Sequence, residues 1–236
     1  MSAGSQVDDV AVVIPARNEA DRIRQTVAAA AGLPGVGLVV VVDDGSSDGT
    51  GAVARGAGAV LLRHTRNRGK AAAMQSGANA VGLVDQRERR ERPRHLLFLD
   101  ADLAESAAQA GPLTDPVLAG TADMTIAVFA ATVKLGGHGL VVGLSGAGIR
   151  RGVGWQPVQP LNGQRCLTRA AFEAARPLAR GWGVETALTI DLMRQGFRVA
   201  EAEVDLAHRA TGTGLRAQLH RAHQLTDVAR ALAARR

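Results

Sequence analysis

The chain has 236 residues and one cysteine, so it is long enough for a single α/β domain with a full core, and an internal disulfide is excluded. Its formal charge of +6 suits an anionic ligand, but tyrosine is absent and the arginines are scattered, which argues against the stacking surfaces of nucleic-acid-binding proteins. No apolar run approaches the roughly 18 residues that would span a bilayer, and residues 1–9 contain no apolar signal region. We therefore expect a cytoplasmic domain that binds a phosphate-bearing small molecule and no nucleic acid.

The first half of the chain predicts alternating strands and helices. Residues 10–14, Val-Ala-Val-Val-Ile, form a continuous apolar run that ends at Pro15, as expected of a strand buried on both faces. Apolar side chains at helical spacing follow, and the alternation then repeats. The predicted strands lie at residues 8–15, 39–42, 59–63 and 95–99, and the predicted helices at 21–31, 50–56 and 69–84. This alternation is typical of a doubly wound, mostly parallel sheet with helices on both faces.

The second half has a less regular pattern. It predicts helices at residues 112–119, 168–175 and 184–194, strands at 123–130, 165–167 and 197–206, and an amphipathic helix from residue 213 onward. A glycine-rich apolar stretch at residues 136–148 cannot be placed, and the mixed-charge run at 85–94 indicates a solvated helix end and loop. Because no linker or repeat divides the chain, we expect one domain over residues 1–236.

Residues 39–50 combine a buried strand with a cluster of acids. Four consecutive valines, typical of an inner parallel strand, run directly into Asp43 and Asp44. Ser47 or Asp48 is the expected N-cap of the next helix. A strand, a turn and a capped helix account for one acid here, but not for two adjacent acids at the end of a buried strand. Ligands of open α/β sheets bind at this edge, so we interpret Asp43 and Asp44 as site residues.

A second pair of acids, Asp100 and Asp102, follows the predicted strand at 95–99. In an extended segment, residues two apart project to the same side, so these carboxylates can meet at one point. Such oxygen ligands suit Mg²⁺ or Mn²⁺, which usually completes its shell with substrate phosphates and water. Acids also commonly end strands, so this Asp-X-Asp (DXD) motif gains weight from its position. We expect it near the first pair, because adjacent parallel strands lie about 5 Å apart.

Four segments of the first half occur in a characteristic order. They are residues 14–19 (Ile-Pro-Ala-Arg-Asn-Glu), 43–50 (Asp-Asp-Gly-Ser-Ser-Asp-Gly-Thr), 67–70 (Asn-Arg-Gly-Lys) and 100–102 (Asp-Ala-Asp). In this order they resemble the nucleotide-sugar-binding half of family 2 glycosyltransferases. The later segments 159–165, 181–185 and 204–209 are similar to those of glucosyl-3-phosphoglycerate synthases. The resemblance implies a single domain of the GT-A type, with residues 1–103 as the nucleotide-sugar-binding half and residues 104–236 as the acceptor-binding half.

The resemblance also implies roles for individual residues. The substrate-binding residues would be Pro15, Ala16, Arg17, Glu19, Asp43, Asp44, Lys70, Asp100, Ala101, Gly163 and Gly183. Among them Glu19 would hold the ribose, and Asp43 or Asp44 would accept a hydrogen bond from the imide N–H of uracil. The metal ligands would be Asp100, Asp102 and His208.

The catalytic residues implied by the resemblance are Lys70, Asp102 and Glu185. Lys70 and the cation would stabilise the departing diphosphate. Glu185 would be the general base of an inverting enzyme, or would orient the sugar in a retaining one. Taken singly, each residue also has an ordinary structural explanation; Glu185, for example, begins a predicted helix, where an acid is favoured anyway. These separate structural explanations do not account for the occurrence of all these residues together in this order.

We therefore predict a metal-dependent enzyme that moves a sugar from a nucleoside diphosphate sugar, such as UDP-glucose, to a phosphorylated small molecule such as 3-phosphoglycerate. Residues 136–148 depart from the longer, more polar acceptor segment of the phosphoglycerate enzymes. With Lys134, Arg150 and Arg151 beside them, they leave open transfer to polyprenyl phosphate at a membrane surface. A nucleotidyltransferase and a catalytically inactive nucleotide-binding module are the alternatives from other classes. Peripheral membrane contact and a homodimer are also left open.

Overall fold

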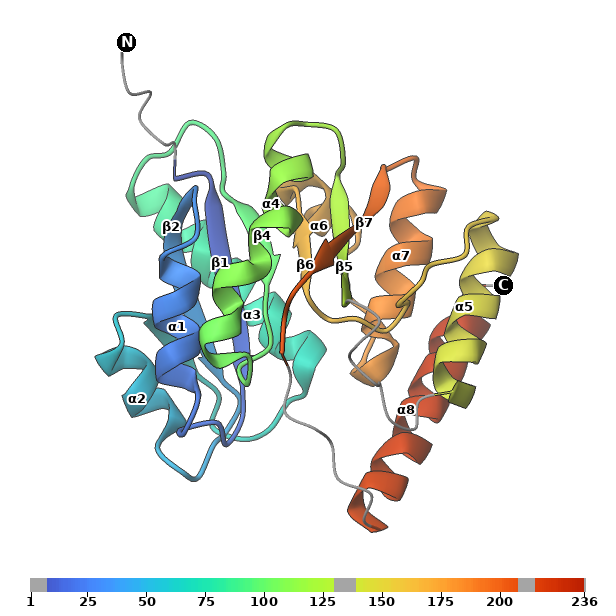
Figure 1. Cartoon of the computed structure of the whole chain (residues 1–236), viewed down its shortest axis with the longest axis horizontal. Helices are drawn as coiled ribbons and strands as arrows, with labels where there is room; N and C mark the ends of the chain where they lie inside the picture. Colours follow the sequence, from blue (N-terminus) through green and yellow to red (C-terminus); the bar gives the residue numbers. More distant parts are fainter. Residues whose placement is uncertain (1–7, 130–138, 208–214, 236) are drawn as a thin grey trace.

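The computed structural model describes residues 8–129, 139–207 and 215–235, except for the side chains of residues 215–222. Within these ranges, seven strands form one sheet in the order β3-β2-β1-β4-β6-β5-β7 (Figure 1). The strands are β1 (Val10–Ala16), β2 (Val36–Asp43), β3 (Val60–Arg63), β4 (His95–Phe98), β5 (Met124–Phe129), β6 (Arg165–Leu167) and β7 (Val199–Val204). All pairings are parallel except those of β6, which runs antiparallel between β4 and β5. The predicted single α/β domain with a mostly parallel sheet is confirmed.

Helices cover both faces of this sheet (Figure 1). They are α1 (Ile23–Ala31), α2 (Thr50–Gly56), α3 (Lys70–Arg87), α4 (Gly111–Leu118), α5 (Gly139–Val153), α6 (Arg169–Ala174), α7 (Val184–Arg194) and α8 (Leu215–Ala233), with 3₁₀ turns η1 (Ala104–Ala110) and η2 (Gly181–Gly183). Alternate residues of the inner strands enter two separate cores: Val12 and Val41 pack with α1 and η1, whereas Val13 and Val42 pack with α3. A strand buried on both faces has no polar alternation, which explains the valine runs of β1 and β2.

The unplaced stretch at residues 136–148 has its described part, from Gly139, inside α5. Glycine there serves close packing, because a Cβ on Gly148 would lie 2.3 Å from Leu232 of α8. Helix α8 packs against α5, α7 and η2, so α5 and α8 lie side by side beyond α7 (Figure 1). No helix within the described ranges combines the length and the apolar character that crossing a bilayer requires.

The mixed-charge run at residues 85–94 is exposed over most of its length, as predicted for a solvated helix end and loop, but its first and last residues are buried. Asp85 and Arg94 are both buried, and Arg94 Nη1 lies 2.6 Å from Asp85 Oδ1. The second guanidinium nitrogen, Nη2, lies 2.6 Å from Glu88 Oε2. This ion pair closes the loop between α3 and β4 at the end of the sheet where the parallel strands begin. Buried charges persist in proteins when they are paired in this way, and sequence periodicity gives no sign of the pairing.

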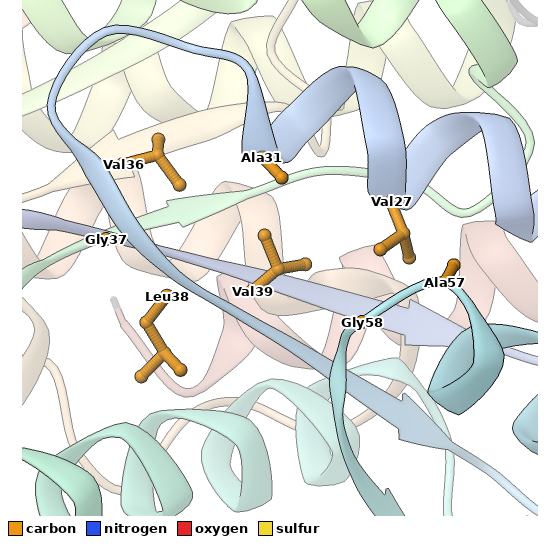
Figure 2. Close-up of a pocket in the computed structure, with 8 residues that line it drawn as sticks. All are labelled: Val27, Ala31, Val36, Gly37, Leu38, Val39, Ala57 and Gly58. Atoms are coloured by element: carbon orange, nitrogen blue, oxygen red, sulfur yellow. The ribbon is translucent and has the colours of Figure 1, made fainter.

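The described structure also contains a pocket of about 260 Å³ between α1, the start of β2 and the turn after α2 (Figure 2). It is lined by Val27, Ala31, Val36, Gly37, Leu38, Val39, Ala57 and Gly58. These residues include no titratable side chain, and β2 runs from this pocket toward Asp43 at its other end. The pocket is therefore separate from the acidic edge of the sheet.

Candidate active site

The ends of β1, β2 and β4 bring the predicted acidic motifs to one edge of the sheet. Ala16 is paired with Asp43, and β4 runs parallel to β1 on its other side. Strand β1 therefore lies between the two acid-bearing strands, and the expectation that these strands are adjacent is wrong. Two strand spacings put their ends about 10 Å apart. The sheet order thus leaves a strip the width of one strand between Asp44 and Asp100.

The loops after β1 and β2 are joined by hydrogen bonds. Asn18 N donates to Ser46 Oγ at 3.0 Å, and Ser47 N donates to Asn18 Oδ1 at 2.9 Å. Asn18 has a φ of 57°, a conformation that asparagine tolerates better than most residues. Asp48 Oδ1 accepts from Thr50 N at 3.1 Å, but the N-cap of α2 is Gly49, one residue after Asp48 and two after Ser47, the two predicted caps. These hydrogen bonds hold the two motifs together.

The side chain of Asp43 turns toward α2 and β3. Its Oδ1 accepts from Ser46 N at 2.8 Å, and its Oδ2 lies 3.3 Å from Arg63 Nε. A Cβ on Gly51 would lie 2.7 Å from the same Oδ2, so the carboxylate is packed directly against the start of α2. These contacts give Asp43 a structural role in the loop after β2.

Asp44 is buried and anchors the segment that leads into α3. Its Oδ1 accepts from Arg68 N at 2.8 Å and its Oδ2 from Gly69 N at 2.8 Å. A third donor is His64, whose Nδ1 lies 2.7 Å from Oδ1. Lys70 follows immediately as the first residue of α3. The carboxylate of Asp44 therefore fixes the backbone that presents Lys70.

Lys70 lies between two acids from different elements. Its Nζ is 2.9 Å from Asp100 Oδ1 and 3.3 Å from Glu185 Oε1. Glu185 is buried in the first turn of α7, and Asp100 follows β4. Burial acts to lower the pKa of Lys70, but the charges and hydrogen bonds of Asp100 and Glu185 outweigh it, so the pKa of Lys70 is raised above its ordinary value. The ammonium is therefore held in its charged form.

Gln164, which sequence reasoning missed as a site residue, holds Asp100 from two sides. Its Oε1 accepts from Asp100 N at 2.8 Å, and its Nε2 donates to Asp100 Oδ2 at 2.7 Å. The preceding Gly163 leaves room for Lys70, because a Cβ there would lie 2.1 Å from Lys70 Nζ. The only signal for Gln164 was its place in segment 159–165. Its partner becomes evident only once β6 is known to pair with β4.

Arg165 is fully buried and ties the loop before β6 to α7. Its guanidinium donates to the carbonyl oxygens of Asn162, Pro160 and Glu185 at 2.8, 3.0 and 2.9 Å. Burial lowers the pKa of Arg165 to about 10, which leaves it charged at neutral pH. Arg165 therefore positions the backbone on both sides of the Lys70 ammonium.

The remaining predicted residues are distributed around this cluster. Pro15 and Ala16 end β1, and Ala16 O accepts from Asp44 N at 2.9 Å. Arg17 is exposed and Glu19 is half-buried, with Glu19 N donating to Thr50 Oγ1 at 2.9 Å. Ala101 O accepts from Thr26 Oγ1 at 2.9 Å.

Two further predicted residues have different outcomes. Gly183 meets α8, because a Cβ there would lie 2.6 Å from Asp227 O, so its small size is explained by packing. His208, the predicted third metal ligand, lies outside the described residues.

The donor set fits a divalent cation that is completed by a ligand. Among the described residues, no group of three or more His, Cys, Asp or Glu side chains could hold a metal ion on its own. Asp100 and Asp102 remain as two carboxylates past the end of β4. Mg²⁺ is usually bound by one or two carboxylates together with substrate phosphates and water, so two carboxylates suffice for this kind of site.

Comparison with curated proteins finds three relatives that share part of this chain. ExoU, a succinoglycan biosynthesis protein of Rhizobium meliloti, is 36% identical over 156 residues, which are 61% of this chain and 46% of ExoU. Protein MJ1222 of Methanocaldococcus jannaschii is 33% identical over 119 residues, 50% of this chain and 46% of that protein. Glycosyltransferase AglJ of Haloferax volcanii is 26% identical over 211 residues, 87% of this chain and 65% of AglJ. The chain thus spans about half the length of the first two.

Solved structures of glucosyl-3-phosphoglycerate synthase from Mycobacterium tuberculosis share the fold. Its complex with phosphoglyceric acid has a TM-score of 0.74 at 24% identity, over 98% of this chain and 80% of that one. Its complex with Mn²⁺, UDP-glucose and glycerol 3-phosphate has a TM-score of 0.74 at 23% identity, again over 98% and 80%. In sequence, the model of the glycosyl transferase family 2 matches residues 11–138, more than half of the chain, including most of β1, the acidic loop after β2, Lys70 and the DXD motif. The chain therefore belongs to glycosyl transferase family 2.

Proposed function

We propose that this chain is a metal-dependent enzyme that transfers a sugar from a nucleoside diphosphate sugar, UDP-glucose or a close relative, to a phosphorylated small molecule such as 3-phosphoglycerate. The observation that carries the proposal is the ammonium of Lys70 held between Asp100 and Glu185 at the carboxyl edge of the sheet. Membership of the family supports the class of reaction. We further propose that residues 1–103 bind the donor and residues 104–236 the acceptor.

Lys70 would act through its charge. Because the pKa of Lys70 is raised, the side chain stays an ammonium at neutral pH and does not serve as a proton donor or acceptor. Cleavage of the bond between the sugar and the diphosphate leaves negative charge on the diphosphate, and a fixed cation beside it lowers the energy of that state. Asp100 and Glu185 keep the ammonium in place, so little rearrangement is needed when this charge develops.

Asp100 and Asp102, with His208 as the proposed third ligand, would hold Mg²⁺ or Mn²⁺. Such a cation neutralises a diphosphate and improves it as a leaving group. Gln164 fixes the carboxylate of Asp100 through its bond to Oδ2. Synthase structures of the same fold contain Mg²⁺ with UDP, or Mn²⁺ with UDP and glucosyl-3-phosphoglycerate, which supports the choice of cation.

Glu185 would contact the sugar or the acceptor. It sits in the first turn of α7, where the helix dipole favours a negative charge, and Arg165 holds its carbonyl oxygen. If the enzyme inverts the anomeric carbon, Glu185 is the general base that takes the proton of the acceptor hydroxyl. If it retains the configuration, Glu185 orients the sugar. The acceptor class is supported by the synthase complexes with phosphoglyceric acid and with glycerol 3-phosphate.

The proposal is tested first by ligand binding. A thermal-shift panel of UDP, GDP and their glucose conjugates, with and without Mn²⁺, should give the largest shift with UDP-glucose and Mn²⁺, because a ligand that binds only the folded state raises its apparent stability. Asp102→Asn should remove the Mn²⁺-dependent part of the shift. The exposed Glu105→Gln, a charge change three residues away, is the matched control.

Product analysis then identifies the reaction. Incubation with UDP-glucose and 3-phosphoglycerate should release UDP and a glucosylated acceptor. Release of pyrophosphate would instead indicate a nucleotidyltransferase. Turnover only with polyprenyl phosphate in detergent would indicate a lipid acceptor at a membrane surface. Nucleotide binding without any turnover would indicate a binding module.

A further inference from the structure

A chain of hydrogen bonds runs from the half-buried Ser76 of α3 through the buried His64 to the carboxylate of Asp44. His64, which directly follows β3, is buried, and its Nδ1 lies 2.7 Å from Asp44 Oδ1. Its other ring nitrogen, Nε2, lies 3.0 Å from the hydroxyl of Ser76 on α3. His64 N also donates to Asp43 O at 2.9 Å, so the backbone of His64 is fixed as well. The proposed mechanism has not used either His64 or Ser76.

The chemistry of the partners assigns the direction of each bond. An ionised carboxylate can only accept, so Nδ1 of His64 carries a proton and donates to Asp44. The hydroxyl of Ser76 lies within hydrogen-bond distance of Nε2, and a hydroxyl can serve there as donor or acceptor. The contacts with Asp44 and Ser76 at the two ring nitrogens hold the imidazole in one orientation.

The partners of Asp44 within the described part of the chain leave one acceptor position of its carboxylate for a ligand. A carboxylate offers about four lone-pair sites. Arg68 N and His64 Nδ1 use Oδ1, and Gly69 N uses Oδ2, so the remaining site is on Oδ2. The two backbone donors lie in the connection between β3 and α3, and His64, at the start of the same connection, is the side chain that contacts the carboxylate.

We propose that His64 is a positioning residue for nucleobase selectivity, because it holds Asp44 so that the free site on Oδ2 accepts the imide N–H of uracil. The proposal rests on the proposed function and names His64 as the residue behind that recognition. Uracil presents an N–H at ring position 3, whereas cytosine presents a lone pair there, so a correctly aimed carboxylate attracts the first and repels the second. Since Asp44 also binds the backbone just before Lys70, the same carboxylate joins base recognition to the placement of the ammonium.

Two isosteric substitutions separate the two bonds of His64. In His64→Asn the amide nitrogen takes the place of Nδ1 and keeps the donor to Asp44, whereas in His64→Gln it takes the place of Nε2 and keeps only the contact with Ser76. The measured quantity is the ratio of the dissociation constants of CDP and UDP, by calorimetry with Mn²⁺. Wild type and His64→Asn should have ratios within about twofold of each other, and His64→Gln should lower the ratio about tenfold or more, as expected for a lost hydrogen bond to a charged group. The exposed His223→Gln is the control.

The ratio distinguishes selectivity from a merely structural role, because loss of stability weakens both nucleotides alike. Equal weakening of UDP and CDP in His64→Gln, with an unchanged ratio, would overturn the inference while leaving the proposed function intact. The same holds if His64→Asn loses selectivity as fully as His64→Gln. Wild-type protein that binds neither nucleotide would overturn the proposed function, and this inference with it.

Discussion

Replacing Gly163 by alanine perturbs the contact on which the site depends. The new Cβ would lie 2.1 Å from Lys70 Nζ and 3.5 Å from Asp100 Oδ1. To reach an ordinary contact of 3.4 Å, the ammonium must move by about 1.3 Å. The clashing atom is the far end of a flexible side chain, so the fold accommodates the change while the ammonium leaves its position between Asp100 and Glu185.

A displacement of this size should strongly reduce the chemical step. Misplacing a group by about 1 Å can lower a rate about a hundredfold, so we expect kcat of Gly163→Ala to fall by that order while its Tm stays within a few degrees of wild type. The assay is UDP release from UDP-glucose under saturating substrates. Gly82→Ala, on the same helix as Lys70 and with nothing near the added methyl, is the control and should not lower kcat. Unchanged kcat in Gly163→Ala would refute the role assigned to Lys70.

Three further predictions concern the groups around this contact. The pKa of Lys70 is raised in the folded state, so the stabilisation from its charge is complete below its ordinary pKa near 10.5 and is lost only at higher pH. The difference in Tm between wild type and Lys70→Met should therefore stay constant from about pH 7 to 9. Arg165→Met leaves buried carbonyl oxygens without donors and should lower the free energy of unfolding in urea by about 3 kcal/mol or more. Asp227→Ala removes the acceptor of Trp182 N, 3.1 Å away, and should lower the free energy of unfolding by about 1 kcal/mol. It should also reduce kcat/KM, because Trp182 lies three residues before Glu185 and its backbone helps to place that residue. Asp227→Asn keeps an acceptor oxygen and should retain most of the stability and most of the activity.

The parts of the fold that local pattern determines could be predicted from the sequence. The valines of β2 have no polar alternation because both faces of that strand are buried, so four consecutive residues were enough to predict a buried strand. The motif Asp-X-Asp could be assigned to a strand end because it directly follows the apolar run of residues 95–99. The helices α2 and α7 lie where periodicity and turn residues predicted them.

The parts that depend on distant partners could not be predicted. The sheet order puts β1 between the acid-bearing strands, and nothing local in either strand encodes its neighbour. Gln164 has no charge and no special spacing, so its hydrogen bond to Asp100 could be recognised only from the pairing of β6 with β4. Asp85 and Arg94 lie in a run that is typical of solvent, yet their mutual contact allows both to be buried.

The antiparallel insertion of β6 bears on how this domain assembles. In a fragment that stops at residue 103, β4 would be a bare sheet edge, because the partner that completes its ladder, at Leu96 to Phe98, comes from residues 165–167. Such an edge is a template for aggregation. We therefore expect the two proposed halves to fold as one cooperative unit, because β4 gains its second neighbour only from residues 165–167. During synthesis from the amino terminus, the sheet edge at β4 therefore stays unpaired until β6 has been made.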